Sequence, residues 1–180
     1  MGRRCRSRQR RLTLAAAPEL RIAPGMARDV PAILGLIRQL AAYEKLAGEA
    51  VATEQQLCEH LFGPRPAAET LIARAGEEAV GFALFFPSFS TFVGRPGIYL
   101  EDLFVIPEWR GRGCGRRLLT AVARIALERG CGRLEWAVLD WNEPALRFYR
   151  RLGARAMDEW TVYRVTNAAL CRLAASEERD

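Results

Sequence analysis

The 180-residue sequence has a single histidine, His60, and its five cysteines form no C-x-x-C pair. A multi-histidine metal site is therefore excluded, and neither a structural zinc site nor a disulfide framework is indicated. A Ser-His or Cys-His nucleophile is disfavoured, because the one histidine lies in a polar, helix-like stretch. No apolar run approaches the roughly 18 residues of a membrane span. We expect a soluble, cytoplasmic protein that binds neither metal nor membrane.

Acidic residues are missing from the first eleven positions, which carry six arginines. The formal net charge of +6 belongs to this segment, since the other Lys and Arg residues balance the 21 Asp and Glu. We expect residues 1–19 to be a disordered, Arg-rich extension. An arm that binds nucleic acid is the alternative, and its affinity would fall steeply with salt. We expect one domain over residues 20–166, followed by a C-terminal helix or tail over 167–180, and no nucleic-acid partner.

Hydrophobic periodicity predicts an alternation of strands and helices, which indicates an α/β fold. Helices are expected after Asp29, over 53–61, from 115 to 130 and over 144–152. Strands are expected at residues 20–22, 70–75, 79–86, 98–105, 134–139, 155–156 and 161–165. The second and third of these strands are joined by Gly76-Glu77-Glu78, which indicates a hairpin.

A glycine-rich loop, Arg110-Gly111-Arg112-Gly113-Cys114-Gly115, lies between a predicted strand and a predicted helix. Glycines at alternate positions let backbone N–H groups turn toward one point, and the helix adds the positive end of its dipole. No Gly-Lys-Ser/Thr follows, which excludes a P-loop, and Arg116 replaces the third glycine of a dinucleotide loop. The loop is predicted to hold a pyrophosphate of another kind.

The spacing Arg110-x-x-Gly113-x-Gly115 after a strand resembles the acyl-CoA motif of the GCN5-related N-acetyltransferase (GNAT) superfamily. Two further motifs match: Tyr-Leu-Glu-Asp-Leu-Phe-Val over 99–105, and Trp-Asn-Glu-Pro over 141–144 followed by Arg-Phe-Tyr over 147–149. They are similar to the diamine (spermidine/spermine) and thialysine acetyltransferase branch, from about residue 22 to 165. The resemblance implies a mixed, mostly antiparallel sheet of about seven strands, flanked on both faces by about four helices.

The same resemblance implies an enzyme that transfers acetyl from acetyl-CoA directly to an amine in a ternary complex. It places the cofactor on backbone and side-chain atoms of Leu103, Phe104, Val105, Gly111, Arg112, Gly113, Cys114, Gly115, Arg116, Asn142, Glu143, Pro144 and Ala145. Asn142 is also expected to cap the helix that follows. Cys114 is expected to be a small packing residue rather than a nucleophile.

Glu101 and Tyr149 are the candidate catalytic residues. A primary ammonium has a pKa of about 10.4 and must lose a proton before it attacks, and Glu101 is the candidate base. Asp102, expected on the opposite face of the strand, is the rival, and an ordinary ion pair is the alternative role for Glu101. By its helical spacing Tyr149 alone would be a core tyrosine; the resemblance makes it the proton donor to the leaving thiolate.

The amine is predicted to bind at Tyr43 and Glu44, at Glu101, and at Glu135, Trp136 and Ala137, all implied by the resemblance. The animal polyamine enzymes carry further acids where this chain has Lys45-Leu46-Ala47-Gly48-Glu49, so a smaller diamine or a thialysine-like amino acid is as compatible as a polyamine. A homodimer is expected. The alternatives are an acetyltransferase of protein N-termini or lysines, and a non-catalytic acyl-CoA sensor.

Overall fold

The computed structural model describes residues 18–176. The chain divides into two compact units, one ending at Ala137 and one beginning at Val138. Among the described residues, no helix combines the length and apolarity needed to cross a membrane.

The first unit is built on a five-stranded sheet in the order β1-β2-β3-β4-β5. The strands are β1 (Leu20–Pro24), β2 (Glu69–Ala75), β3 (Glu78–Ser90), β4 (Arg95–Val105) and β5 (Leu134–Trp136). Neighbours are antiparallel except β4 and β5, which run parallel. The predicted mixed, mostly antiparallel sheet is confirmed, but with five strands among residues 18–176 rather than about seven.

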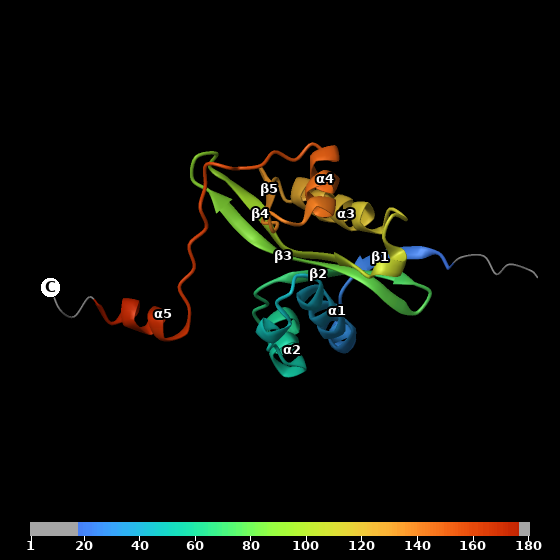
Figure 1. Ribbon diagram of the computed structural model, residues 1–180, viewed down its shortest axis with the longest axis horizontal. Coiled ribbons are helices and arrows are strands. Elements are labelled where there is room, and N and C mark those ends of the chain that lie inside the picture. The colour runs from blue at the N-terminus through green and yellow to red at the C-terminus, as the bar shows by residue number, and fades with distance from the viewer. Residues whose placement is uncertain (1–17, 177–180) are drawn as a thin grey trace, which may run out of the picture. The chain divides into compact units, whose positions relative to one another are not determined.

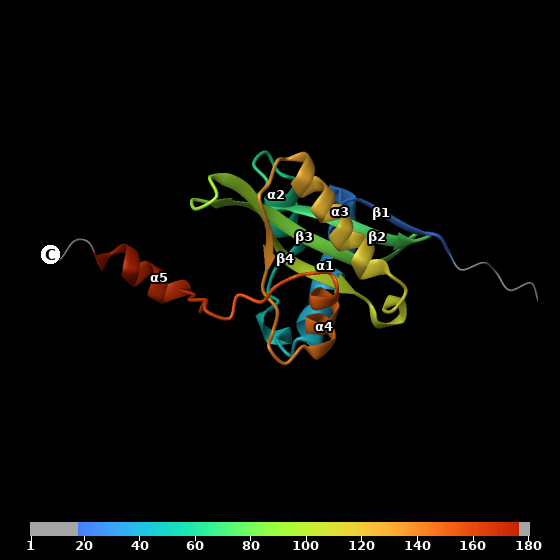
Figure 2. The same cartoon turned by 90° about the horizontal axis from the view of Figure 1, so that it is seen from above.

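Helices cover both faces of this sheet, as Figures 1 and 2 show: α1 and α2 on one face, and α3 on the other. They are α1 (Val30–Tyr43), α2 (Glu54–Phe62) and α3 (Cys114–Glu128), with short 3-10 turns η1 (Ala27–Asp29), η2 (Ala47–Glu49) and η3 (Pro107–Trp109). The predicted apolar stripe of α3 is the side it buries, with Leu118 and Val122 fully inaccessible.

Two contacts fix α1 and α2 on their face of the sheet. Ile33 of α1 and Leu61 of α2 pack with Ile72 of β2 in one buried cluster. The buried carboxylate of Asp29 accepts a hydrogen bond from the Met26 N–H at 2.9 Å and one from the Arg74 guanidinium at 2.7 Å. Asp29 thus ties the start of α1 to β2, and as the N-cap residue of α1 it makes no side-chain cap hydrogen bond to that helix.

The β3–β4 hairpin is longer than the predicted strands. Its register continues from Phe85↔Leu100 to Ser90↔Arg95, whereas β2 pairs with β3 only as far as Phe85. The end of this hairpin exposes Phe89 and Phe92. Phe89 therefore lies in a strand and not in a connecting loop, because the alternating pattern of β3 continues past Pro87.

The second unit contains α4 (Glu143–Arg151) and α5 (Asn167–Ala174). The strands predicted at 155–156 and 161–165 are wrong, because residues 152–166 form no strand. An alternating pattern such as Thr-Val-Tyr-Arg-Val gives a strand only where another strand satisfies its N–H and C=O groups. Likewise β5 ends at Trp136, three residues before the predicted end of that strand.

Replacement of Phe82 should show where the core lies. Phe82 is 0% exposed, and Phe82→Ala is expected to lower the free energy of unfolding by about 3–5 kcal/mol, since it leaves a cavity. Phe92 is 94% exposed, so the matched Phe92→Ala should change it by less than about 0.5 kcal/mol. Urea unfolding followed by circular dichroism measures both. Equal losses in the two variants would contradict the burial described here.

Candidate functional site

The glycine-rich loop places a row of backbone N–H groups at the start of α3. Gly111 and Gly113 have φ angles of 73° and 80°, a left-handed conformation that favours glycine, and Gly113 is the N-cap of α3. The first hydrogen bond of the helix runs from the Arg117 N–H to the Gly113 carbonyl at 3.0 Å. The N–H groups of residues 114–116 precede it and have no acceptor within the helix. No acidic residue lies in this first turn, so the loop can hold a phosphate group.

Cys114, at the first position of α3, is buried at 1% exposure. Burial raises the pKa of its thiol to about 11, with Arg117 acting weakly in the opposite direction. The thiol is therefore neutral at physiological pH and is a poor nucleophile. Its side chain packs in the core, which agrees with the packing role predicted for it.

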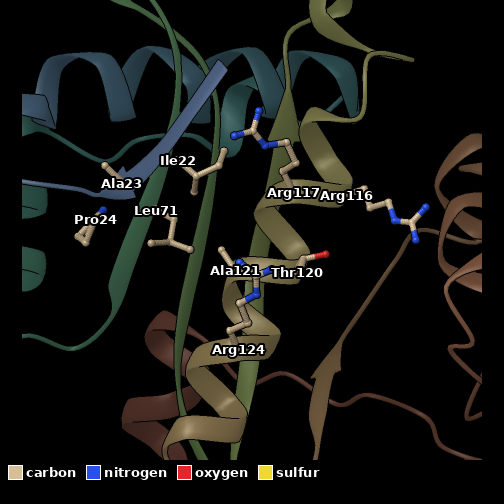
Figure 3. Close-up of a pocket in the computed structure, with 9 residues that line it drawn as sticks. All are labelled: Ile22, Ala23, Pro24, Leu71, Arg116, Arg117, Thr120, Ala121 and Arg124. Atoms are coloured by element: carbon tan, nitrogen blue, oxygen red, sulfur yellow. The ribbon is translucent and has the colours of Figure 1, made fainter. Parts of the chain in front are cut away.

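A hollow of about 440 Å³ lies on the β1 side of α3 (Figure 3). Apolar side chains of β1 and β2 form one wall, including Ile22 and Leu71, and α3 forms the other. Figure 3 shows Arg117 reaching over the hollow, and the neighbouring Arg116 also lines it, with its guanidinium pointing away from Ile22 in this view. Both arginines that follow the glycine-rich loop therefore line this hollow.

Strand β4 is irregular at Glu101. Its register with β3 passes from Leu100↔Phe85 directly to Asp102↔Leu84, so Glu101 is the extra residue of a β-bulge. Pairing with β5 ends one residue earlier, at Leu100↔Trp136. From Glu101 to Val105, β4 therefore continues beside β3 only. This stretch contains Leu103, Phe104 and Val105, which were predicted to contact the cofactor.

The bulge changes the direction of the side chains that follow it. Asp102 pairs with Leu84, which packs against the cluster of Ile33 and Leu61, so Asp102 lies on the α1 face of the sheet. The Glu101 side chain is exposed. Two neighbouring carboxylates, one exposed and one largely buried, are thus placed at the point where β4 and β5 part.

Three carboxylates form one cluster here: Glu44, Glu101 and Asp102. Burial raises the pKa of Asp102 to about 7, and the negative charges of Glu101 and Glu44 add to this effect. Burial also raises the pKa of Glu44. Within residues 18–176, none of the ion pairs involves these three side chains. An acidic cluster without cations of its own is suited to a cationic ligand.

Other predicted site residues of the first unit lie beside this cluster in the fold. Tyr43 is the last residue of α1, and Glu44 follows it as the C-cap. Glu135 and Trp136 of β5 pair with Tyr99 and Leu100 of β4, close to the bulge. The carboxylate of Glu135 accepts from the Arg133 guanidinium at 2.7 Å, so its charge is compensated. Ala137 directly follows β5.

Tyr149 and Asn142 lie in the second unit. Asn142 is the N-cap of α4, and its side-chain oxygen accepts from the Ala145 N–H at 3.3 Å, which confirms the predicted cap. Glu143 and Pro144 form the first turn of α4, and Glu143 pairs with Arg147 at 3.5 Å. Tyr149 lies in the last turns of α4, with its ring centroid 5.1 Å from that of Phe148.

Sequence reasoning missed two features of this site. Asp102 was treated as a rival to Glu101, whereas the bulge places it in one cluster with Glu101 and Glu44. Arg110 was treated only as part of the loop, whereas its guanidinium lies over the Tyr43 ring. The adjacent Glu101-Asp102 pair in an apolar strand was a sequence signal for the carboxylate cluster. The sequence holds no signal for the contact between Arg110 and Tyr43.

The cluster predicts a pH dependence of stability. Because the pKa of Asp102 lies above 3.8 in the folded protein, the folded state holds this proton more tightly than the unfolded state. The contribution of Asp102 to the free energy of unfolding should therefore fall as pH rises from about 4 to about 7. Asp102→Asn should remove this slope and gain stability relative to wild type above pH 7.

Urea unfolding between pH 4 and pH 8 measures the effect. Glu78→Gln, at an exposed carboxylate outside the cluster, is the matched control and should keep the wild-type slope. Parallel pH profiles for wild type and Asp102→Asn would contradict a buried, proton-holding Asp102.

Comparison with known proteins shows the family of the chain. Residues 39–154 match the Acetyltransferase (GNAT) family. Thialysine N-epsilon-acetyltransferase of Bos taurus is 41% identical, over 81% of this chain and 92% of the relative. L-ornithine N5-acetyltransferase of Arabidopsis thaliana is 33% identical, over 79% of this chain and 82% of the relative.

Among solved structures, an integron cassette protein from the mobile metagenome of V. cholerae has a TM-score of 0.73 and 28% identity. The match covers 86% of this chain and 97% of that protein. The predicted resemblance and the acyltransferase class are therefore confirmed, and the chain belongs to the Acetyltransferase (GNAT) family.

Proposed function

We propose that this protein transfers the acetyl group of acetyl-CoA to the primary amine of a small cationic molecule, of the thialysine, ornithine or diamine class. The observation that carries the proposal is the cluster of Glu44, Glu101 and Asp102 at the bulge of β4. The names of the relatives support it, since two of them act on thialysine and on ornithine.

The first unit has groups that fit the cosubstrate. Backbone N–H groups of the loop from Gly111 to Arg116 would bind the pyrophosphate, and the positive end of α3 would favour its charge. The edge of β4 from Leu103 to Val105, which β5 does not cover in the pairing, offers N–H and C=O groups to the amide-bearing arm. The resemblance adds Asn142, Glu143, Pro144 and Ala145 of the second unit.

Glu101 is the proposed base. The ammonium group of the substrate must lose a proton, and the exposed Glu101 carboxylate would accept it directly or through a water molecule. Glu44 and Asp102 would hold the cation beside it by Coulomb attraction. The freed nitrogen then bonds to the acetyl carbonyl carbon while the carbon–sulfur bond breaks, and the nitrogen loses its second proton to water as it becomes the amide. Both reactants must be bound together for this step, which is why we propose a ternary complex.

Tyr149 is the proposed acid. The sulfur leaves with the electron pair of the broken bond, and a proton from a phenol would neutralise the thiolate. Support for Tyr149 comes from its match to the Phe-Tyr motif of the family and from its position on a capped helix, α4. This assignment needs the phenolic proton, so removing the hydroxyl alone tests it.

The charges favour a compact amine over a long polyamine. Glu135 is neutralised by Arg133, so Glu44, Glu101 and Asp102 are the carboxylates at the proposed amine site that remain for a cation. Tyr43, Trp136 and Ala137 would contact the uncharged part of the amine. One or two positive charges match three carboxylates, of which Asp102 is only partly ionised near pH 7.

The oligomer and the compartment complete the proposal. We place the protein in the cytoplasm, because its free cysteines, Cys58, Cys114, Cys131 and Cys171, stay reduced in that compartment.

We propose a homodimer, supported by the exposed side chains of Val162 and Tyr163 in a segment with strand-like alternation. Such a segment can pair with a strand of a second copy.

A substrate panel tests the proposed activity. The full chain is incubated with acetyl-CoA and, separately, thialysine, ornithine, putrescine, spermidine, spermine and an N-terminal peptide, and CoA release is measured. The compact amines should give the highest kcat/KM and the peptide the lowest, because the carboxylate cluster selects a free ammonium. Highest turnover with the peptide would favour the protein acetyltransferase, and CoA binding without any turnover would favour the sensor.

Loss of the Tyr149 hydroxyl should slow the chemical step. Tyr149→Phe is expected to lower kcat about a hundredfold, with the Kd for CoA changed less than twofold, since only proton donation is removed. Tyr163→Phe, at a tyrosine that is 90% exposed, is the matched control and should retain wild-type kcat. Steady-state kinetics and CoA titration provide both numbers. Wild-type kcat in Tyr149→Phe would exclude Tyr149 as the acid.

A further inference from the structure

Arg110, the first residue of the glycine-rich loop, is turned toward α1. Its Nε–H donates to the Val105 carbonyl at 2.9 Å. Its guanidinium carbon lies 4.5 Å from the centroid of the Tyr43 ring and 5.5 Å from that of Phe104. The cation is thus held by one backbone acceptor and two aromatic faces, and it joins the end of β4 to the end of α1.

These contacts differ from those of a phosphate ligand. An arginine that binds phosphate presents its fork of N–H groups to the anion. In Arg110 the Nε–H is used by Val105, and the plane of the group is engaged by Tyr43 and Phe104. Arg112, two residues on, lies instead over the Trp109 ring at 5.1 Å. The two arginines of the loop therefore contact different parts of the fold.

The end of α1 that Arg110 contacts is a tightly defined turn. The Leu46 N–H donates to the Ala41 carbonyl at 2.8 Å and the Lys45 N–H to the Ala42 carbonyl at 3.2 Å, the pair of bonds of a Schellman motif. Lys45 adopts the left-handed φ of 63° that this motif requires, although it is not glycine. The conformation is unfavourable for lysine and persists only where neighbouring contacts hold it.

Glu44 lies between these two features. It is the C-cap of α1, directly after Tyr43 and directly before the left-handed Lys45. Its carboxylate is near enough to Asp102 to act on it electrostatically. A displacement of the Tyr43 backbone would move Glu44 as well, because the two residues are adjacent on one hydrogen-bonded turn.

We propose that Arg110 is a positioning residue of the amine site: it fixes Tyr43 against the end of β4, and so sets the place of the Glu44 carboxylate beside Asp102 and Glu101. This inference rests on the proposed function, since it assigns the amine to that cluster. It also connects the two halves of the site. The residue that opens the phosphate loop holds the amine-binding end of α1, so both sites depend on one side chain.

Removal of the Arg110 cation should affect the amine and not CoA. Arg110→Met keeps much of the side-chain length but loses the charge and the Nε donor. We expect the KM for thialysine to rise about tenfold, with kcat and the Kd for CoA each changed less than twofold. Arg110→Lys should recover part of the loss, since it keeps the cation without the planar fork. Arg38→Met, at an exposed arginine of α1, should match wild type.

A double-mutant cycle tests whether Arg110 acts through Tyr43. In a Tyr43→Leu background, Arg110→Met should raise the KM for thialysine less than threefold further, because the contact is already lost. If the double variant raised the KM for thialysine by the product of the two single-variant factors, the two residues would act independently and the proposal would be overturned. So would a rise in the Kd for CoA with an unchanged amine KM, which would make Arg110 a phosphate ligand.

Hydrogen–deuterium exchange separates this proposal from the proposed function. Arg110→Met should speed exchange over residues 40–49 and leave α3 as in wild type, whether or not an amine is turned over. If no amine is acetylated by wild type but this local change is seen, the proposed function fails and the positioning contact stands. Unchanged exchange over 40–49 would overturn the positioning role itself.

Discussion

Strand β4 loses regular pairing on both of its sides within two residues, and the arrangement of the site depends on this point. On the β3 side Glu101 is the extra residue of a bulge, and on the β5 side pairing stops at Leu100. A bulge bends its strand and redirects the side chains that follow. Asp102 is thereby turned toward α1, while Glu101 stays exposed. From Glu101 to Val105, the edge of β4 that faces away from β3 is not paired with β5.

Negative and positive charge lie on opposite sides of Val105 in the sequence of β4 and α3. Glu101 and Asp102, with Glu44 from the end of α1, carry negative charge, and the start of α3 with its arginines carries positive charge. A cationic amine and an anionic cosubstrate can thus be bound near one another without competing for the same groups. Cys114, at the first position of α3, stays a neutral packing residue because burial raises the pKa of its thiol.

The sequence predicted the local features well, because they depend on single residue types. Gly111 and Gly113 do adopt left-handed angles, Asn142 does cap α4, and the apolar stripe of α3 is buried. Features that depend on tertiary pairing were not predictable. The alternation over 161–165 indicated a strand without showing whether a partner strand exists. The adjacent Glu101-Asp102 pair indicated a concentration of carboxylates, but it did not locate the bulge. The contact of Arg110 with Tyr43 joins residues far apart in sequence, so no periodicity reveals it.

The central claim is that one irregular strand positions a carboxylate cluster for an amine beside a phosphate-binding helix start. A crystal structure of the full chain with CoA and thialysine tests it most directly. We expect the pyrophosphate oxygens within hydrogen-bond distance of N–H groups of residues 111–116, and the side-chain ammonium of thialysine beside Glu101 and Glu44. An ammonium bound away from all three carboxylates, or a pyrophosphate bound elsewhere than the start of α3, would contradict the account.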